Sequence, residues 1–264
     1  MRKVARIGLI LFIVLFLVFG LLFLKELRIQ QQEVSEFAEL TQLIIPQIAD
    51  PATREESVTP SKPETATHRD LTPSKPETAT HRDLTPLFEQ NSDCIGWIYI
   101  DDTQVNYPVM HTPEDPQRYL RRNFYRESSN SGVPFLDGSC TVESDNLIIY
   151  GHNMKNGTMF ANITEYKDSD YTSQHPVIEF DTAGGCKRFA VFAVVQVKKN
   201  DSWYSFRRAK NREEYDSAIA QIKERALYDT GITPAFGDQL LTLSTCYGKS
   251  KDDRIIVIGA EKKE

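Results

Sequence analysis

The stretch of sequence that most constrains the fold is residues 240–259, LLTLSTCYGKSKDDRIIVIG, which read as a strand, a polar loop and a second strand. Cys246 closes the first strand and Arg254 opens the second. A hairpin of this form brings the two side chains to the same end of the strand pair. A thiol beside a fixed cation favours the thiolate, which is the reactive nucleophile. The stretch therefore predicts a β-hairpin with a reactive site at one end.

The N-terminus predicts a membrane anchor. Basic residues occupy positions 2, 3 and 6, and residues 7–24 then run for 18 positions without a charge. At ~1.5 Å per residue such a helix is ~27 Å long, close to the thickness of a bilayer core. The alternative is a cleaved signal peptide, but the run is long for one and no A-x-A pattern follows it. We therefore expect residues 1–24 to be a signal anchor of a single-pass protein, with a cytoplasmic N-terminus and an extracellular remainder.

Three further segments follow the expected anchor. Residues 25–49 have apolar positions at helical spacing, which predicts a juxtamembrane helix continuous with the anchor. Residues 50–86 have the composition of a flexible linker and contain TPSKPETATHRDL twice in tandem. The repeat has too few apolar residues to bury a face, so it predicts a spacer in which His68 and His81 are solvated rather than bound to metal. Residues 87–264 form the globular domain.

The globular domain reads as a succession of short strands with few helices. Helical patterns occur only at 115–124 and 211–227. A mostly β fold of seven or eight strands is expected to form a closed or nearly closed β-barrel with peripheral helices, and closure removes exposed strand edges. Besides the final hairpin, strands are predicted at 96–100, 106–110, 133–137, 146–152, 176–180 and 188–199.

Composition and missing motifs exclude several classes of protein. The formal net charge is −6 and no basic stripe is interleaved with aromatic residues, which argues against nucleic-acid binding. The four cysteines have no C-x-x-C spacing and suggest neither a zinc knuckle nor a disulfide framework. No H-E-x-x-H motif, EF-hand loop, Gly-rich phosphate loop or G-x-S-x-G elbow occurs. We therefore expect no metal and no cofactor.

The candidate nucleophile and base are Cys246 and His152. Cys246 ends an apolar strand beside a polar loop, although a packed core cysteine is the alternative. A cysteine nucleophile needs a base, and His152 also ends an apolar strand, IIYGH. A surface-loop role stays open for His152. His111 ends a strand in a similar way, whereas His175 precedes a proline in a polar turn and reads as structural.

Arg254 is the third candidate. Its guanidinium has a permanent charge and a rigid fork of donors, which suit a substrate carbonyl or the oxyanion of a tetrahedral intermediate. The alternative is an ordinary surface arginine paired with Asp252 or Asp253. Those two carboxylates could orient Arg254, but we favour a solvating role for them in the loop.

These motifs together resemble those of a known family. TLSTC at 242–246 followed by an arginine at the next strand, with IIYGHNM at 148–154 upstream, is similar to the signature of the sortases, membrane-anchored cysteine transpeptidases of Gram-positive surfaces. The resemblance spans residues 87–263 and is closest to class B, where YGHNM, KNGTMF and the GWI and YPV strands recur. It implies a sortase β-barrel with an added N-terminal helical piece. The tandem repeat and the short YGKSKDD loop after the cysteine depart from the pattern.

The resemblance also implies a role for each matching residue. Cys246 would attack the carbonyl of a threonine in a sorting signal and form a thioester. His152 would protonate the leaving amine and later deprotonate the incoming one, while Arg254 would hold the substrate and stabilise the oxyanion. Three further residues would line the peptide groove, namely Leu120, Tyr150 and Ser244.

The implied function is a cysteine transpeptidase that cleaves the C-terminal sorting signal of a surface protein and joins it to an amine of a peptidoglycan precursor. Three alternatives stay open from the sequence. One is a sortase that polymerises pilins through a lysine amine, and another is a plain cysteine peptidase that uses water. The third is a membrane-tethered binding module in which Cys246 is merely packed.

Overall fold

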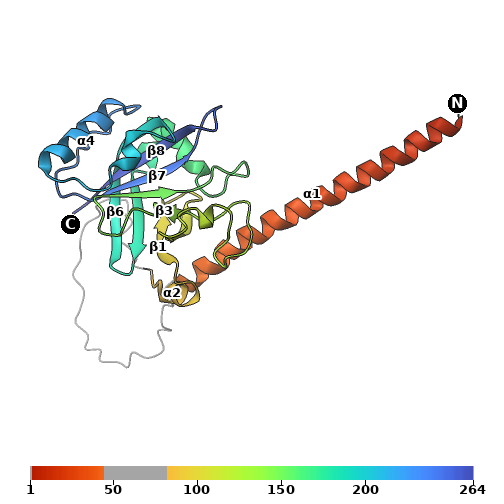
Figure 1. Ribbon diagram of the computed structural model, residues 1–264, viewed down its shortest axis with the longest axis horizontal. Coiled ribbons are helices and arrows are strands. Elements are labelled where there is room, and N and C mark those ends of the chain that lie inside the picture. The colour runs from red at the N-terminus through yellow and green to blue at the C-terminus, as the bar shows by residue number, and fades with distance from the viewer. Residues whose placement is uncertain (1, 45–81, 264) are drawn as a thin grey trace, which may run out of the picture.

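The computed structural model describes residues 2–44 and 82–263. A long helix, α1 (Arg2–Ile44), is followed by a β-barrel with short helices around it (Figure 1). α1 runs without a break across residue 24, where the anchor is expected to end. Most of the predicted linker at 50–86, with His68 and His81, lies outside the described residues.

Eight strands close into a barrel in the order β1-β2-β3-β4-β7-β8-β6-β5. The pairs β2/β3 and β4/β7 are parallel and the other six pairs are antiparallel. The predicted closed β-barrel is therefore confirmed, with eight strands. The strands are β1 (Cys94–Tyr99), β2 (Asn106–Met110), β3 (Phe135–Leu136), β4 (Asn146–Tyr150), β5 (Val177–Thr182), β6 (Gly185–Lys198), β7 (Leu240–Cys246) and β8 (Asp253–Glu261).

Short helices lie around the barrel, as predicted. The predicted helix 211–227 is α4 (Arg212–Glu224), whose N-cap Asn211 accepts a hydrogen bond from the amide of Glu214 at 2.9 Å. α4 buries Tyr215, Ile219 and Ile222. The remaining short helices are α2 (Thr85–Gln90), η1 (Arg118–Leu120), η2 (Ala161–Lys167), α3 (Ser169–Gln174) and η3 (Ser202–Ser205).

The strands that reach the candidate site are buried on both faces. Six of the seven residues of β7 are buried, a pattern typical of a strand with cover on each side. One cover is the barrel interior. The other is η3, because the indole of Trp203 donates to the hydroxyl of Thr242 in β7 at 3.0 Å. β7 is therefore held firmly up to its last residue, which is exposed.

Two predicted elements are shorter than the sequence suggested. The predicted helix 115–124 contains only the single turn η1, because the carbonyl of Tyr119 accepts from the amide of Val133 instead of continuing a helix. The predicted strand 133–137 shrinks to β3. Pro134 has no N–H to donate to a ladder, and the carboxylate of Asp137 accepts from the amide of Ser139, which turns the chain.

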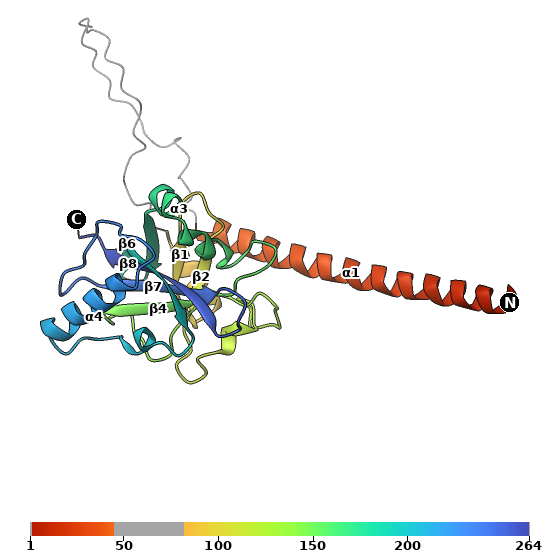
Figure 2. The same cartoon turned by 90° about the horizontal axis from the view of Figure 1, so that it is seen from above.

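The C-terminal end of α1 docks on the barrel while its other end projects away (Figures 1 and 2). Phe37, Leu40 and Ile44 are buried at the docked end. Farther out the side chains are exposed, with Phe12 at 66% and Phe16 at 69%. Within the part of the chain that the structure describes, no helix meets the length and hydropathy needed to cross a membrane.

Gly96 tests the packing of β1 against β5. A Cβ at this position would lie 2.3 Å from the carbonyl oxygen of Asp181 and 2.8 Å from the ring of Phe180. We expect Gly96→Ala to lower the free energy of unfolding by about 1–3 kcal/mol through overpacking. The matched control is Gly184→Ala, whose Cβ meets only the hydroxyl of Thr182 at 3.5 Å. Equal denaturation midpoints for the two variants would contradict the packing described.

Candidate active site

The three candidate catalytic residues stand at the ends of three neighbouring strands. β4 and β7 run parallel with Tyr150 opposite Ser244, so two residues farther along both chains His152 comes level with Cys246. β7 and β8 are antiparallel, and Cys246 pairs directly with Arg254. Adjacent strands are about 4.8 Å apart. The order across the sheet is therefore His152, Cys246, Arg254, as the predicted hairpin requires for the last two.

The pairing of β4 with β7 continues beyond the end of β4. The amide of Gly151 donates to the carbonyl of Ser244 at 3.1 Å, and the hydroxyl of Thr245 donates to the carbonyl of Gly151 at 2.8 Å. The side-chain amide of Asn153 then donates to the carbonyl of Cys246 at 3.0 Å. These bonds on both sides of residue 152 hold the loop that carries the histidine beside the cysteine.

A groove with a volume of about 580 Å³ opens at these strand ends. All the residues that the sequence analysis selected line it, the three catalytic candidates together with Leu120, Tyr150 and Ser244. Its far walls come from two connections, the one between β2 and β3, which carries Leu120, and the one between β6 and β7, which contributes Asn200 and Tyr204. The six residues thus converge on a single concave site, which is a typical ligand-binding geometry.

Cys246 differs from the other cysteines in its exposure. All four are free, and Cys246 alone has an exposed side chain. Burial raises the pKa of Cys94 to about 12, and burial with the carboxylate of Asp181 raises the pKa of Cys186 to about 12. Burial also raises the pKa of Cys140. The thiolate is therefore disfavoured at the other three positions, and the alternative of a packed core cysteine does not describe Cys246.

His152 is held by the backbone carbonyl of Leu120. Its Nε2 lies 2.9 Å from that oxygen, and because a carbonyl can only accept, Nε2 carries a hydrogen. Burial lowers the pKa of His152, the carbonyl opposes this, and the charge of Arg121 lowers the pKa further. The net decrease favours the neutral ring. Nδ1 is then the nitrogen with a lone pair, and it can accept a proton.

Arg254 is fixed by main-chain carbonyls. Its Nη1 donates to the carbonyl of Lys251 at 2.9 Å and to that of Asp253 at 2.8 Å. The carboxylates of Asp252 and Asp253 instead form ion pairs with Lys199 and Lys198. The predicted alternative of a surface pair with these carboxylates is therefore wrong. No described residue accepts from Nε or Nη2 of Arg254, so those donors can serve a bound carbonyl.

The wall of the groove contains a polar network that sequence reasoning missed. The hydroxyl of Tyr150 donates to Asp137 at 2.9 Å, and Arg207 donates to the other oxygen of that carboxylate at 3.0 Å. The hydroxyls of Tyr204 and Ser244 lie 2.8 Å apart. Asp137 and Tyr204 both line the groove, but they come from a loop after β3 and from the short helix η3, whose sequences carry no motif. Only the tertiary fold brings them to Tyr150 and Ser244.

The other described histidines lie outside the groove. His175 contacts the carbonyl of Asp101 at 2.9 Å through Nδ1 and packs on the ring of Tyr171, in agreement with a structural role. His111 has a buried Nε2 that finds no hydrogen-bond partner among the described residues. Because His111 does not line the groove, it does not compete with His152 as the base. Among the described residues, no group of three or more His, Cys, Asp or Glu side chains could hold a metal ion.

Thiol alkylation tests the assignment of Cys246 as the accessible thiol. With iodoacetamide at pH 8, we expect Cys246 to be modified at least about tenfold faster than the other three, because their buried thiols resist ionisation. Peptide mass spectrometry after short reaction times measures the order of labelling. Labelling of Cys186, the other incompletely buried thiol, at the same rate would contradict the burial and charge described here.

Known proteins share the sequence and fold that build this site. A family model described as the sortase domain matches residues 98–262. Sortase B of Listeria monocytogenes serovar 1/2a is 32% identical over 158 residues, or 59% of this chain, and the chain spans only 63% of that protein's length.

Among solved structures, a Staphylococcus aureus sortase B–substrate complex is 27% identical with a TM-score of 0.63, covering 67% of this chain and 83% of that one. A sortase B complexed with triglycine is 28% identical with a TM-score of 0.62, covering 67% and 84%. The chain therefore belongs to the sortase family, and within it to class B.

Proposed function

We propose that this protein is a cysteine transpeptidase with Cys246 as nucleophile, His152 as the proton-transfer group and Arg254 as the oxyanion donor. The observation that carries the proposal is the placement of an exposed thiol between a neutral imidazole and a guanidinium, at the ends of three adjacent strands. This is the arrangement of nucleophile, base and oxyanion donor that acyl transfer requires.

In the first half of the reaction the enzyme is acylated. The thiol proton of Cys246 passes to Nδ1 of His152 as sulfur attacks the carbonyl carbon, and the carbonyl electrons move to oxygen, where Arg254 donates to the oxyanion. When the intermediate collapses, the C–N bond breaks and the imidazolium gives its proton to the leaving amine. The products are a thioester on Cys246 and a free amine, with neutral His152 restored.

In the second half an amine takes the acyl group. His152 accepts a proton from the incoming amine as its nitrogen attacks the thioester carbonyl, and Arg254 again donates to the oxyanion. The C–S bond then breaks, and the proton returns from His152 to the thiolate of Cys246. A new amide is released and the enzyme regains its starting state.

Under this proposal the acyl donor is the C-terminal sorting signal of a surface protein, attacked at a threonine carbonyl. The support is the groove lined by Leu120, Tyr150 and Ser244, together with the related S. aureus enzyme solved as a substrate complex. For the acceptor we propose an amine of a peptidoglycan precursor, because a related sortase B was solved with triglycine. A pilin lysine as acceptor, or water as in a plain peptidase, are the alternatives.

A transfer assay with the full chain in detergent tests the activity. Labelled sorting peptides are incubated with triglycine, with a lysine peptide, or without amine, and products are identified by mass spectrometry. Cys246→Ala is expected to form no product, Cys186→Ala to match wild type, and Arg254→Gln to lower kcat/KM by roughly 10²-fold. Transfer to triglycine supports the proposal, and transfer to lysine alone points to pilin polymerisation.

Two other results would count against the transferase. Hydrolysis without transfer to any amine would indicate a plain cysteine peptidase. The absence of an acyl adduct on Cys246 would overturn the nucleophile assignment. Trapping that adduct also gives the mass of the recognised fragment. The same measurement therefore identifies both the nucleophile and the part of the sorting signal that is retained.

We also propose that the chain acts at the outer face of the cell membrane. The support is in the sequence, in the uncharged run at 7–24 behind basic residues and the repeat-containing linker at 50–86. The linker would serve as a spacer between the membrane and the catalytic domain. The partners are then the membrane itself, a surface protein and an amine acceptor.

Charge insertion tests the anchor. An arginine near the centre of a membrane span costs about 2.5–3.5 kcal/mol, so Leu15→Arg/Val18→Arg is expected to release much of the protein from the carbonate-washed membrane pellet. Gln31→Arg, an exposed position of α1 beyond the apolar run, is the matched control and should stay in the pellet. A wild-type chain that carbonate extracts as readily as the double variant would contradict an anchor.

A further inference from the structure

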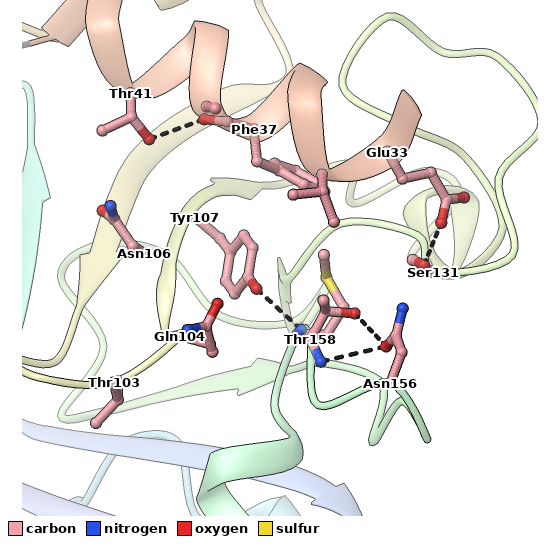
Figure 3. A pocket seen from close by; sticks show the side chains of 13 residues that line it. Glu33, Phe37, Thr41, Thr103, Gln104, Asn106, Tyr107, Ser131, Asn156 and Thr158 are labelled. Atoms are coloured by element: carbon pink, nitrogen blue, oxygen red, sulfur yellow. Dashed lines mark hydrogen bonds between the residues drawn. The ribbon is translucent and has the colours of Figure 1, made fainter. Parts of the chain in front are cut away.

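The docked end of α1 is tied to one segment of the barrel by its carboxylates. Glu33 accepts a hydrogen bond from the hydroxyl of Ser129 at 2.6 Å. It also accepts one from the hydroxyl of Ser131, which Figure 3 shows. Glu36 accepts from the side-chain amide of Asn123 at 2.9 Å and from the main-chain amide of the next residue at 3.2 Å. Both carboxylates therefore bind the same connection between β2 and β3, the segment 121–131.

These hydrogen bonds lie beside a gap in the otherwise packed contact between α1 and the barrel. A cavity of about 240 Å³ lies between α1 and the barrel, lined by Glu33 and Phe37 on one side and by Tyr107 and Asn156 on the other (Figure 3). Burial raises the pKa of Glu36, although its bonds to Asn123 and the following amide oppose this. A desolvated carboxylate stays at such a contact only when its donors are in place.

The segment that α1 binds leads directly to His152. The amide of Ser129 donates to the carbonyl of Arg121 at 3.0 Å, which closes the segment back on its own start. Gly132 comes next with φ of +60°, and a Cβ there would lie 2.5 Å from the carbonyl oxygen of Tyr119. The segment 121–131 and Gly132 therefore fix the position of Leu120. The carbonyl of Leu120 is the group that accepts from Nε2 of His152.

A second route leads from α1 to the backbone of His152. The rings of Phe37 and Tyr107 meet edge to face at 5.0 Å (Figure 3). The hydroxyl of Tyr107 accepts from the amide of Met159 at 3.0 Å. The next amide, that of Phe160, donates to the carbonyl of His152 at 2.8 Å. The loop after β4 is thus supported from the side of α1 as well as from Cys246.

We propose that the docked end of α1 is a positioning element of the active site, acting on the ring of His152 through the segment 121–131 and on its backbone through Tyr107. The inference rests on the proposed function, in which His152 must exchange protons with substrate. It adds that the helix leading from the expected anchor is needed for the geometry of the catalytic groove as well as for tethering. Docking of α1 then sets the productive position of the imidazole.

The test is the full-length double variant Glu33→Ala/Glu36→Ala in detergent. We expect kcat/KM to fall roughly 10- to 100-fold, the scale of effect of small misplacements in an active site. The pKa of His152, followed by NMR of the labelled imidazole, is expected to rise toward 6.5, because burial is the larger cause of its decrease. Arg121, whose charge also lowers this pKa, lies in the same segment, so its displacement acts in the same direction. None of the variants in this test alters Arg254, so the proposed oxyanion donor is the same in each.

The matched control is Glu39→Ala, which removes an exposed carboxylate from the same helix and should leave both readouts at wild-type values. Ser131→Ala removes one donor from the barrel side. We expect it to change kcat/KM and the pKa of His152 in the same directions as the double variant, but by smaller amounts. It therefore decides the question if the double variant does not fold. A lower melting temperature with wild-type kcat/KM and an unchanged His152 titration would overturn the proposal. The titration needs no substrate, so it decides this inference even if no peptide is turned over.

Discussion

The parallel ladder between β4 and β7 is the interaction on which the site depends. Parallel strands end at the same edge of a sheet, so the register of Tyr150 with Ser244 makes neighbours of His152 and Cys246, which are far apart in the chain. β8 then returns antiparallel and supplies Arg254. A slip of one residue in either ladder would turn one partner to the opposite face. The barrel therefore sets the catalytic geometry through its hydrogen-bond register.

The electrostatics of the groove depend first on the burial of His152 and on its contact with the carbonyl of Leu120. Burial favours neutral His152, and Leu120 leaves only Nδ1 to accept a proton. In the proposed mechanism this neutral base takes the thiol proton during the reaction, so charge develops in the transition state. The fixed donors of Arg254 are then most useful at that moment, since preorganised donors stabilise developing charge without reorganising.

Local patterns predicted most of the strands but only part of the site. The hairpin placed Cys246 beside Arg254 because antiparallel neighbours are close in sequence. The β4–β7 pairing is a long-range contact, so local patterns made His152 a candidate base without separating it from His111, and its role came from the family resemblance. The helix expected at 115–124 failed because long-range hydrogen bonds took its carbonyls. Asp137 and Tyr204 had no local signal, since each acquires its role only when loops from different parts of the chain meet.

Two partly buried carboxylates tie together loops in and beside the groove wall. Asp93 accepts from the hydroxyl of Tyr119 at 2.7 Å and from Arg126 at 3.1 Å, beside the residue whose carbonyl holds His152. Asp137 similarly joins Tyr150 to Arg207. Burial alone would raise the pKa of both carboxyls, but these hydrogen bonds outweigh it and lower the pKa. Both therefore stay ionised at a lower pH than a free aspartate would, and the order they impose weakens only as pH falls through their lowered pKa values. Asp93 and Asp137 thus join separate segments of these loops, as backbone hydrogen bonds join the strands of the barrel.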